Sequence, residues 1–399
     1  MRIGVDLTAL LPEATGVDVA LVGLVRALAR VDRESAYTIF VNREDREQFE
    51  GTLPATFSIR ALALRPRAAR LVFQQAVLPV ASAALRLDVL HSPSFIQPMV
   101  RTSARHVLTV HDLTSFTRPR DHLPLRRSSP YLWAVRASVQ GADVVTVPSR
   151  AVKDTIATHL GAAAAGRVRV LPWGIDDGFA PMAAEAARAR LRPLDLPDEY
   201  VLFVGTIEPR KNVLGLLAAY REVLREAPET PPLLLAGRLG WGYEPVLREM
   251  ERSELRGRVR RLGYVTAEDL PALYAAASVF VYPSHEEGFG FPPLEAMASG
   301  VPTIATAGSS LAENLHGAAE LVPVDDTAAL AASLRRLLGD PRLRAQRREQ
   351  GIARARSFRW DECGRRYVEL YRELALGPAA GAHDDASHDA DFPPSARAS

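Results

Sequence analysis

Short apolar runs that are rich in valine and isoleucine recur along this chain, and each is followed by a turn and then by a helical pattern. In the first half these runs cover residues 2–7, 37–41, 58–64, 88–92, 106–112, 143–149 and 167–174. After a loop-like stretch the alternation restarts, with runs at residues 201–207, 232–237, 258–265, 278–284, 302–306 and 319–324. Continuous apolar runs that alternate with helices are typical of buried parallel strands. The restart therefore predicts an α/β fold with two doubly wound, Rossmann-like domains.

The expected domain limits follow from where this alternation stops and begins again. We expect one Rossmann-like domain over residues 1–176, a second over 190–358, and a helix over 359–376 that packs back on the body of the protein. Residues 377–399 contain almost no core-forming side chains, so we expect a disordered tail there. Two such domains would face each other across a cleft, with ligands beyond the carboxyl ends of the strands.

Charge and cysteine content exclude several classes of protein. The chain has 49 Lys+Arg and 47 Asp+Glu, a formal charge of +2, which gives no basis for a nucleic-acid partner. Cys363 is the only cysteine, so an intramolecular disulfide and a cysteine-based zinc site are ruled out. The N-terminus does not read as a signal peptide, and no apolar run reaches membrane-spanning length. We expect a cytoplasmic protein, attached at most peripherally to the inner face of a membrane.

Two cations mark the end of the first strand of the second half. Arg210 and Lys211 come just before a helix that Asn212 can cap. Cations beside the free N–H groups of a helix N-terminus suit a phosphate. A solvated pair on a surface turn is the plain alternative, but the position at a strand end of a cleft-forming domain favours the phosphate.

The stretch "SHEEGFGFPPLEAMASGVPT" places two carboxylates around a glycine-containing loop. Gly288 and Gly290 would let the backbone approach a ligand, with N–H groups turned toward an anion. With Pro293 at its start, the next helix would carry Glu295 in its first turn, and Glu287 stands before it. Carboxylates would repel a diphosphate, so we expect them to accept hydrogen bonds from the hydroxyls of sugars on either side of it. The alternative for Glu295 is that it only complements the helix dipole.

The first half offers fewer candidates for chemistry. His111 and Asp112 end a buried strand, where titratable groups are costly unless they are used or paired. A structural histidine is the plain alternative. A turn at Thr15 and Gly16 joins the first strand to an apolar-faced helix, and its small residues would admit a phosphate or an acceptor.

Together these segments point to a known family. The combination of "FVGTIEPRKN", "EGFGFPPLEAMASGVP" with its Glu-x7-Glu spacing, "VHDL" and "VPS" resembles the family 4 glycosyltransferases of the GT-B fold, over nearly the whole chain except the tail. The resemblance implies a retaining hexosyltransferase that uses a nucleoside-diphosphate sugar and no metal or other cofactor. Its mannosyl-type features favour GDP-mannose. The acceptor would be a hydroxyl of a glycan, a lipid-linked acceptor or a small molecule.

The resemblance also assigns roles to residues. The first domain would bind the acceptor and the second the donor. Arg210 and Lys211 would bind the donor diphosphate, Glu295 the ribose and Glu287 the transferred sugar, while His111 would lie near the reacting centre. The catalytic set is then His111, Glu287, Arg210 and Lys211, and the donor-binding set is Gly16, Gly205, Arg210, Lys211, Glu287, Gly288, Phe289, Gly290 and Glu295. Trp173 is a departure, because the family commonly has Asn before the glycine at that point.

Other interpretations predict different sequences. A nicotinamide oxidoreductase should show a G-x-G-x-x-G turn after an early strand, and none is present. A non-catalytic sugar-nucleotide-binding subunit of a glycan-assembly complex would be expected to lose Lys211 or Glu287, and both are present. Arginines beside apolar residues in 60–79 and 118–136 suggest contact with an anionic membrane surface, although solvated helix faces explain them equally well.

Overall fold

The computed structural model describes residues 1–11, 15–122 and 128–377. The segment 377–399, which we expected to be disordered, lies outside the described residues except for Gly377.

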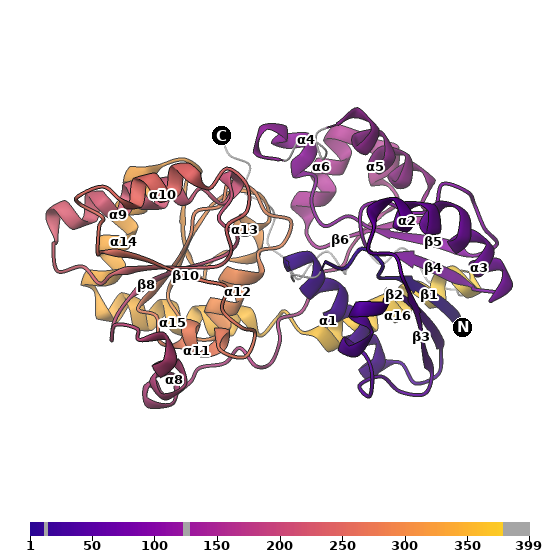
Figure 1. Cartoon of the computed structure of the whole chain (residues 1–399), viewed down its shortest axis with the longest axis horizontal. Helices are drawn as coiled ribbons and strands as arrows, with labels where there is room; N and C mark the ends of the chain where they lie inside the picture. Colours follow the sequence, from indigo (N-terminus) through magenta and orange to yellow (C-terminus); the bar gives the residue numbers. More distant parts are fainter. Residues whose placement is uncertain (12–14, 123–127, 378–399) are drawn as a thin grey trace. The chain divides into compact units, whose positions relative to one another are not determined.

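Two compact units make up the described chain (Figure 1). The first unit contains Met1–Gly174 and the segment that begins at Arg359, and the second contains Ile175–Phe358. Helix α8 (Ala184–Leu191) packs against α11 (Leu270–Ala275) of the second unit. Residues 177–189, which lie between the two expected domains, therefore belong to the second unit.

All seven apolar runs of the first half form strands of one parallel sheet, in the order β3-β2-β1-β4-β5-β6-β7. The strands are β1 (Arg2–Asp6), β2 (Ala36–Asn42), β3 (Phe57–Leu62), β4 (Val89–Ser92), β5 (Arg105–Thr109), β6 (Val144–Val147) and β7 (Val168–Val170). Their side chains are mostly buried because helices cover the sheet. Part of this core lies between β5, β6 and the helices α5 (Ser129–Gly141) and α6 (Arg150–Leu160), and includes Leu108, Val135, Val139, Val145, Val152 and Ile156.

The first helix of this unit begins at a capping box. Helix α1 (Gly16–Val31) starts after Thr15, whose backbone N–H and hydroxyl both donate to the Asp18 carboxylate. The others are α2 (Arg67–Val72), α3 (Leu78–Ala84), α4 (Thr114–Thr117), α5 (Ser129–Gly141), α6 (Arg150–Leu160), α7 (Ala162–Ala165) and α16 (Trp360–Leu376), with a π-helical turn at Phe73–Val77 and 3₁₀ turns at Arg43–Gln48 and Pro119–Asp121.

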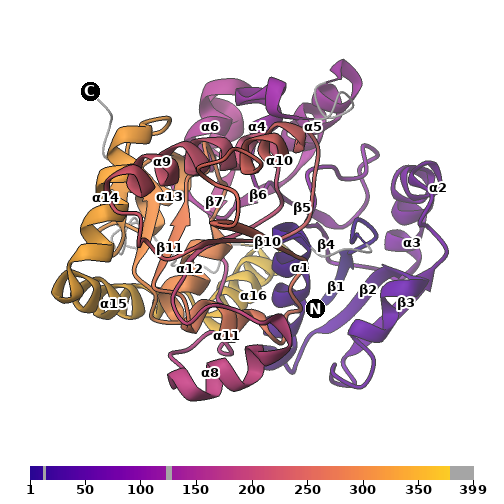
Figure 2. The ribbon, with the colours of Figure 1, turned by 60° about the vertical axis from the view of Figure 1, so that its left-hand side comes forward.

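The C-terminal helix α16 packs on α1, as Figures 1 and 2 show. Contact is close at Gly23, where an added Cβ would lie 2.2 Å from Cζ2 of Trp360. A glycine at this position therefore lets the indole of α16 lie directly on α1.

The second unit repeats the same architecture with a six-stranded parallel sheet in the order β10-β9-β8-β11-β12-β13. Its strands are β8 (Val201–Val204), β9 (Leu233–Ala236), β10 (Val259–Gly263), β11 (Val279–Tyr282), β12 (Thr303–Thr306) and β13 (Glu320–Val322). Besides α8 and α11, its helices are α9 (Val213–Glu226), α10 (Glu244–Met250), α12 (Phe291–Ala298), α13 (Ser309–Asn314), α14 (Thr327–Gly339) and α15 (Pro341–Ala355), with 3₁₀ turns at Arg192–Leu194 and Pro209–Lys211. Across the described ranges, no helix has both the length and the apolar character needed to cross a membrane.

The order of the strands in the second unit determines where a ligand site is expected there. In the second unit the chain runs outward from β8 through β9 and β10, and from β11 through β12 and β13 in the other direction. The neighbouring strands β8 and β11 thus form the switch point at which ligands bind in doubly wound sheets. The loops after these two strands contain most of the residues singled out above.

Candidate active site

The loop after β8 places Arg210 and Lys211 directly before helix α9. They lie in the 3₁₀ turn Pro209–Lys211, and Asn212 follows with φ of 50°. The Asn212 side chain accepts a hydrogen bond from the backbone N–H of Gly215 at 3.2 Å. The cap predicted from sequence is confirmed, and it directs the chain so that both cations precede the helix N-terminus.

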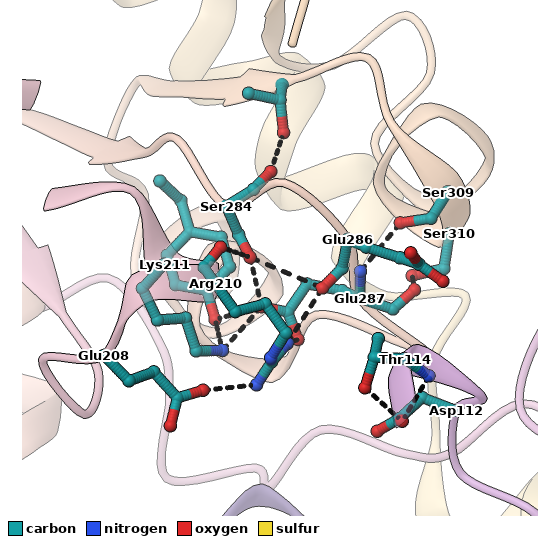
Figure 3. A network of polar contacts seen from close by, with 12 residues as sticks. Asp112, Thr114, Glu208, Arg210, Lys211, Ser284, Glu286, Glu287, Ser309 and Ser310 are labelled. Atoms are coloured by element: carbon teal, nitrogen blue, oxygen red, sulfur yellow. Dashed lines mark hydrogen bonds and ion pairs between the residues drawn. The ribbon is translucent and has the colours of Figure 1, made fainter. Parts of the chain in front are cut away.

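Both cations bond to Glu287, from the loop after β11 (Figure 3). Lys211 Nζ lies 2.5 Å from Glu287 Oε1, and Arg210 Nη1 lies 2.9 Å from Glu287 Oε2. The second arm of the Arg210 guanidinium, Nη2, donates to Glu208 Oε1 at 2.9 Å. The structure therefore brings three of the four predicted catalytic residues into one ion-paired cluster.

Neutral hydroxyls complete this cluster. Tyr282 OH accepts from Lys211 Nζ at 2.6 Å and donates to Glu287 Oε1 at 3.0 Å. Ser284 Oγ donates to the same oxygen at 2.7 Å. Tyr282, Ser284 and Glu208 were missed from the sequence, although all three stand at the ends of β8 and β11, which was the available signal.

Electrostatics keep the Glu287 carboxyl ionised. Glu287 and Lys211 are buried, with 9% and 8% of their surfaces exposed. Burial alone would raise the pKa of Glu287, but the charges of Arg210 and Lys211 outweigh it and lower this pKa to about 2. Burial and the neighbouring Arg210 lower the pKa of Lys211, while Glu287 opposes that change. Glu287 thus orients the two cations. This role is additional to the predicted contact between Glu287 and the sugar hydroxyls.

Glu295 lies just beyond the first turn of α12, in which the sequence predicted it. The helix begins at Phe291, with Gly290 as its N-cap, so Glu295 is its fifth residue and the placement in the first turn was wrong. Proline at the second and third positions is tolerated because the first N–H groups of a helix have no partner inside it. The dipole alternative loses its support, since that effect fades beyond the first turn.

Glu295 is buried, and a tyrosine hydroxyl bonds to its carboxyl group. Its Oε2 accepts a hydrogen bond from Tyr274 OH at 3.1 Å. Burial raises the pKa of Glu295 to about 7, with a smaller contribution from Asp176, and the bond from Tyr274 only partly offsets this. The two carboxylates of the Glu-x7-Glu spacing therefore have opposite electrostatic character.

The loop between these carboxylates is fixed by its own packing. Gly290 has φ of 90°, and an added Cβ would lie 2.5 Å from Leu311 Cδ2, so glycine is required there. Gly288 is buried, and the ring of Phe289 packs against Phe291 and Phe358. Gly205, at the end of β8, has φ of 155°, and its N–H donates to the carbonyl of Ala236 at 2.9 Å.

Helix α13 also supports this loop. Ser309 Oγ accepts from the backbone N–H of Glu287 at 2.7 Å, and Ser310 Oγ donates to the carbonyl of Glu287 at 2.8 Å. Asn314 Nδ2 donates to the carbonyl of Phe289 at 2.8 Å. These residues were also missed, although "AGSSLAEN" directly follows a predicted strand.

Two of the predicted site residues belong to the first unit. His111 is buried after β5, and its Nε2 donates to the carbonyl of Pro93 at 2.8 Å. Asp112 Oδ1 accepts from the backbone N–H of Thr114 at 3.0 Å and from its hydroxyl at 2.7 Å. Gly16 is the first residue of α1 and is exposed.

For the ranges that the structure covers, no group of three or more His, Cys, Asp or Glu side chains is arranged to bind a metal ion.

Two doubly wound units of this kind occur together in a class of solved structures. The chain superposes on a sucrose-phosphate synthase from Thermosynechococcus elongatus with a TM-score of 0.79 and 24% sequence identity, over 94% of this chain and 99% of that one. The predicted GT-B architecture of glycosyltransferases is thereby confirmed.

Sequence comparison is more specific than the fold. The family described as "Glycosyl transferases group 1" matches residues 189–354, and "Glycosyltransferase Family 4" matches residues 14–179. The O-antigen chain mannosyltransferase B of Escherichia coli is 34% identical over 287 residues, which are 72% of this chain and 74% of that protein. The serotype-specific mannosyltransferase WbdA of Escherichia coli is 26% identical over 357 residues, 86% of this chain but 43% of that protein. The chain belongs to the family 4 glycosyltransferases, and the predicted resemblance and enzyme class are confirmed.

Proposed function

We propose that this glycosyltransferase transfers mannose from GDP-mannose, with retention at the anomeric carbon, to a hydroxyl of a glycan, lipid-linked or small-molecule acceptor. The observation that carries the donor site is the buried cluster of Arg210, Lys211 and Glu287 at the β8/β11 switch point. The two relatives named as mannosyltransferases support mannose as the sugar.

The hydrogen-bond pattern of the cluster suits an incoming diphosphate. An ammonium group has three N–H donors. Among the described residues, Lys211 Nζ donates to Glu287 and Tyr282, which leaves one N–H for a phosphate oxygen. Because Glu287 already orients both cations, little reorganisation is needed when negative charge develops on the leaving diphosphate. Arg210 and Lys211 then stabilise this leaving group.

In the transfer step itself, the main task of the protein is to orient the donor and the acceptor, rather than to supply a further reactive group. In the proposed front-face route, the departing phosphate oxygen takes the proton of the acceptor hydroxyl as the new glycosidic bond forms on the same face of the sugar. Glu295 accepts hydrogen bonds from the ribose, and His111 belongs to the reacting centre. Because the two cations neutralise the diphosphate, we propose that the reaction needs no divalent metal.

A thermal-shift series tests the donor and the metal independence together. The protein is heated with UDP-, GDP-, ADP- or dTDP-sugars, each in the presence and in the absence of EDTA. GDP-mannose at about 100 times its Kd is expected to stabilise the native state by about 2.7 kcal/mol. For units of this size that corresponds to a rise in Tm of roughly 5–10 °C. A rise with another nucleotide alone would contradict the proposed base, and a rise that EDTA removes would contradict metal independence.

We also propose that the first unit contacts the inner face of an anionic membrane through α2, α3 and the loop beside them. Gln75 bonds to the carbonyl of Gln97 and to the backbone N–H of Met99, so the loop lies against the helical segment. The exposed apolar side chains of α2, the π-helical turn after it, α3 and this loop are Leu71, Val72, Val77, Val80, Met99 and Val100. The second segment expected to contact a membrane, 118–136, lies partly outside the described residues.

Vesicle sedimentation tests this membrane contact. The protein is expected to sediment with phosphatidylglycerol vesicles at low salt, and the variant V72E/V80E is expected to stay in the supernatant, because charges on the apolar face oppose its insertion. Leu214→Glu, at an exposed apolar position of the second unit, is the matched control and should sediment like the native protein. No sedimentation of the native protein, or equal sedimentation of V72E/V80E, would refute the proposal.

A further inference from the structure

The indole of Trp173 lies against the imidazole of His111. Trp173 follows β7 and is 1% exposed. The two rings are stacked, with centroids 5.6 Å apart and planes inclined by 23°. Phe95 contacts His111 at a centroid distance of 5.5 Å. The orientation of the imidazole is thus defined by aromatic rings in addition to the bond from Nε2 to Pro93.

Helix α16 supports the indole in turn. Tyr367 is stacked on Trp173 at 5.9 Å with an angle of 9° between the rings, and Trp360 packs beside Trp173 at 6.0 Å. Gly174 allows this approach, since an added Cβ would lie 2.2 Å from the backbone nitrogen of Trp360. The stack therefore continues from His111 through Trp173 into the C-terminal helix.

Buried hydrogen bonds fix α16 against the sheet at the same place. Tyr371 OH bonds to Nδ1 of His91 at 2.7 Å, and Nε2 of His91 bonds to Thr109 Oγ1 at 2.7 Å. Tyr367 OH donates to Thr146 Oγ1 at 3.1 Å. These bonds leave the ring of Tyr367 little freedom to move, so the surface on which Trp173 rests is rigid.

We propose that Trp173 is a positioning residue that holds the His111 imidazole in its orientation for sugar transfer by stacking it against α16. The inference rests on the function proposed for His111. In this chain the C-terminal helix therefore supports a residue of the reacting centre through one indole.

Two substitutions at position 173 distinguish the effect of a flat aromatic ring from the effect of side-chain volume alone. Trp173→Phe keeps an aromatic face, whereas Trp173→Met fills the space with a flexible chain. In the native protein and in W173F, the ¹⁵N resonances of His111, assigned with H111A, should report an imidazole with its proton on Nε2. In W173M they should move toward the average of the two tautomers. Trp133→Met, at a tryptophan that is 65% exposed, is the matched control and should leave them unchanged.

Kinetics links this orientation to the reaction. With GDP release from GDP-mannose as the assay, W173M is expected to lower kcat by about tenfold to a hundredfold through misplacement of the imidazole, with KM within about threefold of native. W173F should retain kcat within about threefold, since the flat face remains. If W173M does not fold, Tyr367→Met removes the support on the far side of the indole and should produce the same change in the His111 resonances.

The outcomes distinguish this inference from the proposed function. Native ¹⁵N resonances of His111 in folded W173M or Y367M would overturn the positioning role and leave the function of His111 intact if H111A is inactive. Native activity of H111A would instead refute the proposed function of His111, and the positioning role with it. Loss of activity in H111A, together with altered resonances and a lower kcat in W173M, would support both.

Discussion

Replacing Lys211 with methionine is expected to reduce sugar transfer by at least about 100-fold. The substitution removes a charged donor beside the proposed diphosphate, a loss of roughly 1.5–3 kcal/mol for the hydrogen bond alone. It also leaves Glu287 with Arg210 as its remaining cationic partner, so the carboxylate competes more strongly with the donor for that guanidinium. The measurement is GDP release from GDP-mannose, and activity within about threefold of native would contradict the assignment of the diphosphate site.

The same variant is expected to be less stable. Leaving a buried charge wholly without a partner costs about 3–5 kcal/mol, and the loss here should stay below that range because Arg210 still pairs with Glu287. The double variant K211M/E287Q should recover most of this loss in denaturant unfolding while remaining inactive. Lys153, the only other lysine of the chain, provides the matched control, and K153M should be native in both measurements. Recovery of activity in the double variant would show that Lys211 acts only by pairing with Glu287.

The affinity for GDP-mannose is expected to rise by up to about 100-fold between pH 5 and pH 8. Burial raises the pKa of Glu295 to about 7, so its carboxyl is protonated at pH 5. Ribose hydroxyls donate better to the carboxylate than to the neutral acid, and about 1% of a group with this pKa is ionised at pH 5. Binding should therefore release a proton near pH 6, which titration calorimetry in two buffers of different ionisation enthalpy detects.

The control for this pH dependence is Glu295→Gln. E295Q cannot ionise, so its affinity should be weaker at pH 8 and nearly constant across the range. In the absence of donor, the folding stability changes with pH in the opposite direction to the donor affinity. The reason is that the native state binds the proton of Glu295 more tightly than the unfolded chain does. The stability contributed by this group is therefore present at pH 4 and lost as the pH rises to about 7. A donor affinity of the native enzyme that does not change with pH would refute the contact between Glu295 and the ribose.

The secondary structure was predictable to a large extent. All thirteen apolar runs form strands, because a parallel strand covered on both faces leaves a continuous apolar signature that needs no knowledge of its partners. The helix start at Asn212 was also predictable, because a helix cap involves residues that are only a few positions apart. The start of α12 was not, because two prolines are compatible with any of the first helical positions.

By itself, the sequence determined which segments form strands and helices, which loops lie at strand ends, and the family to which the chain belongs. All of these depend on short-range periodicity or on residues within one motif. Only the tertiary structure decided the partners of those residues. Lys211 and Glu287 are 76 positions apart and meet because β8 and β11 are neighbours in the sheet. Trp173 likewise stacks on His111 and Tyr367 because α16 returns to the first unit. Side-chain pairing over such separations depends on strand order and helix packing, which no local pattern encodes.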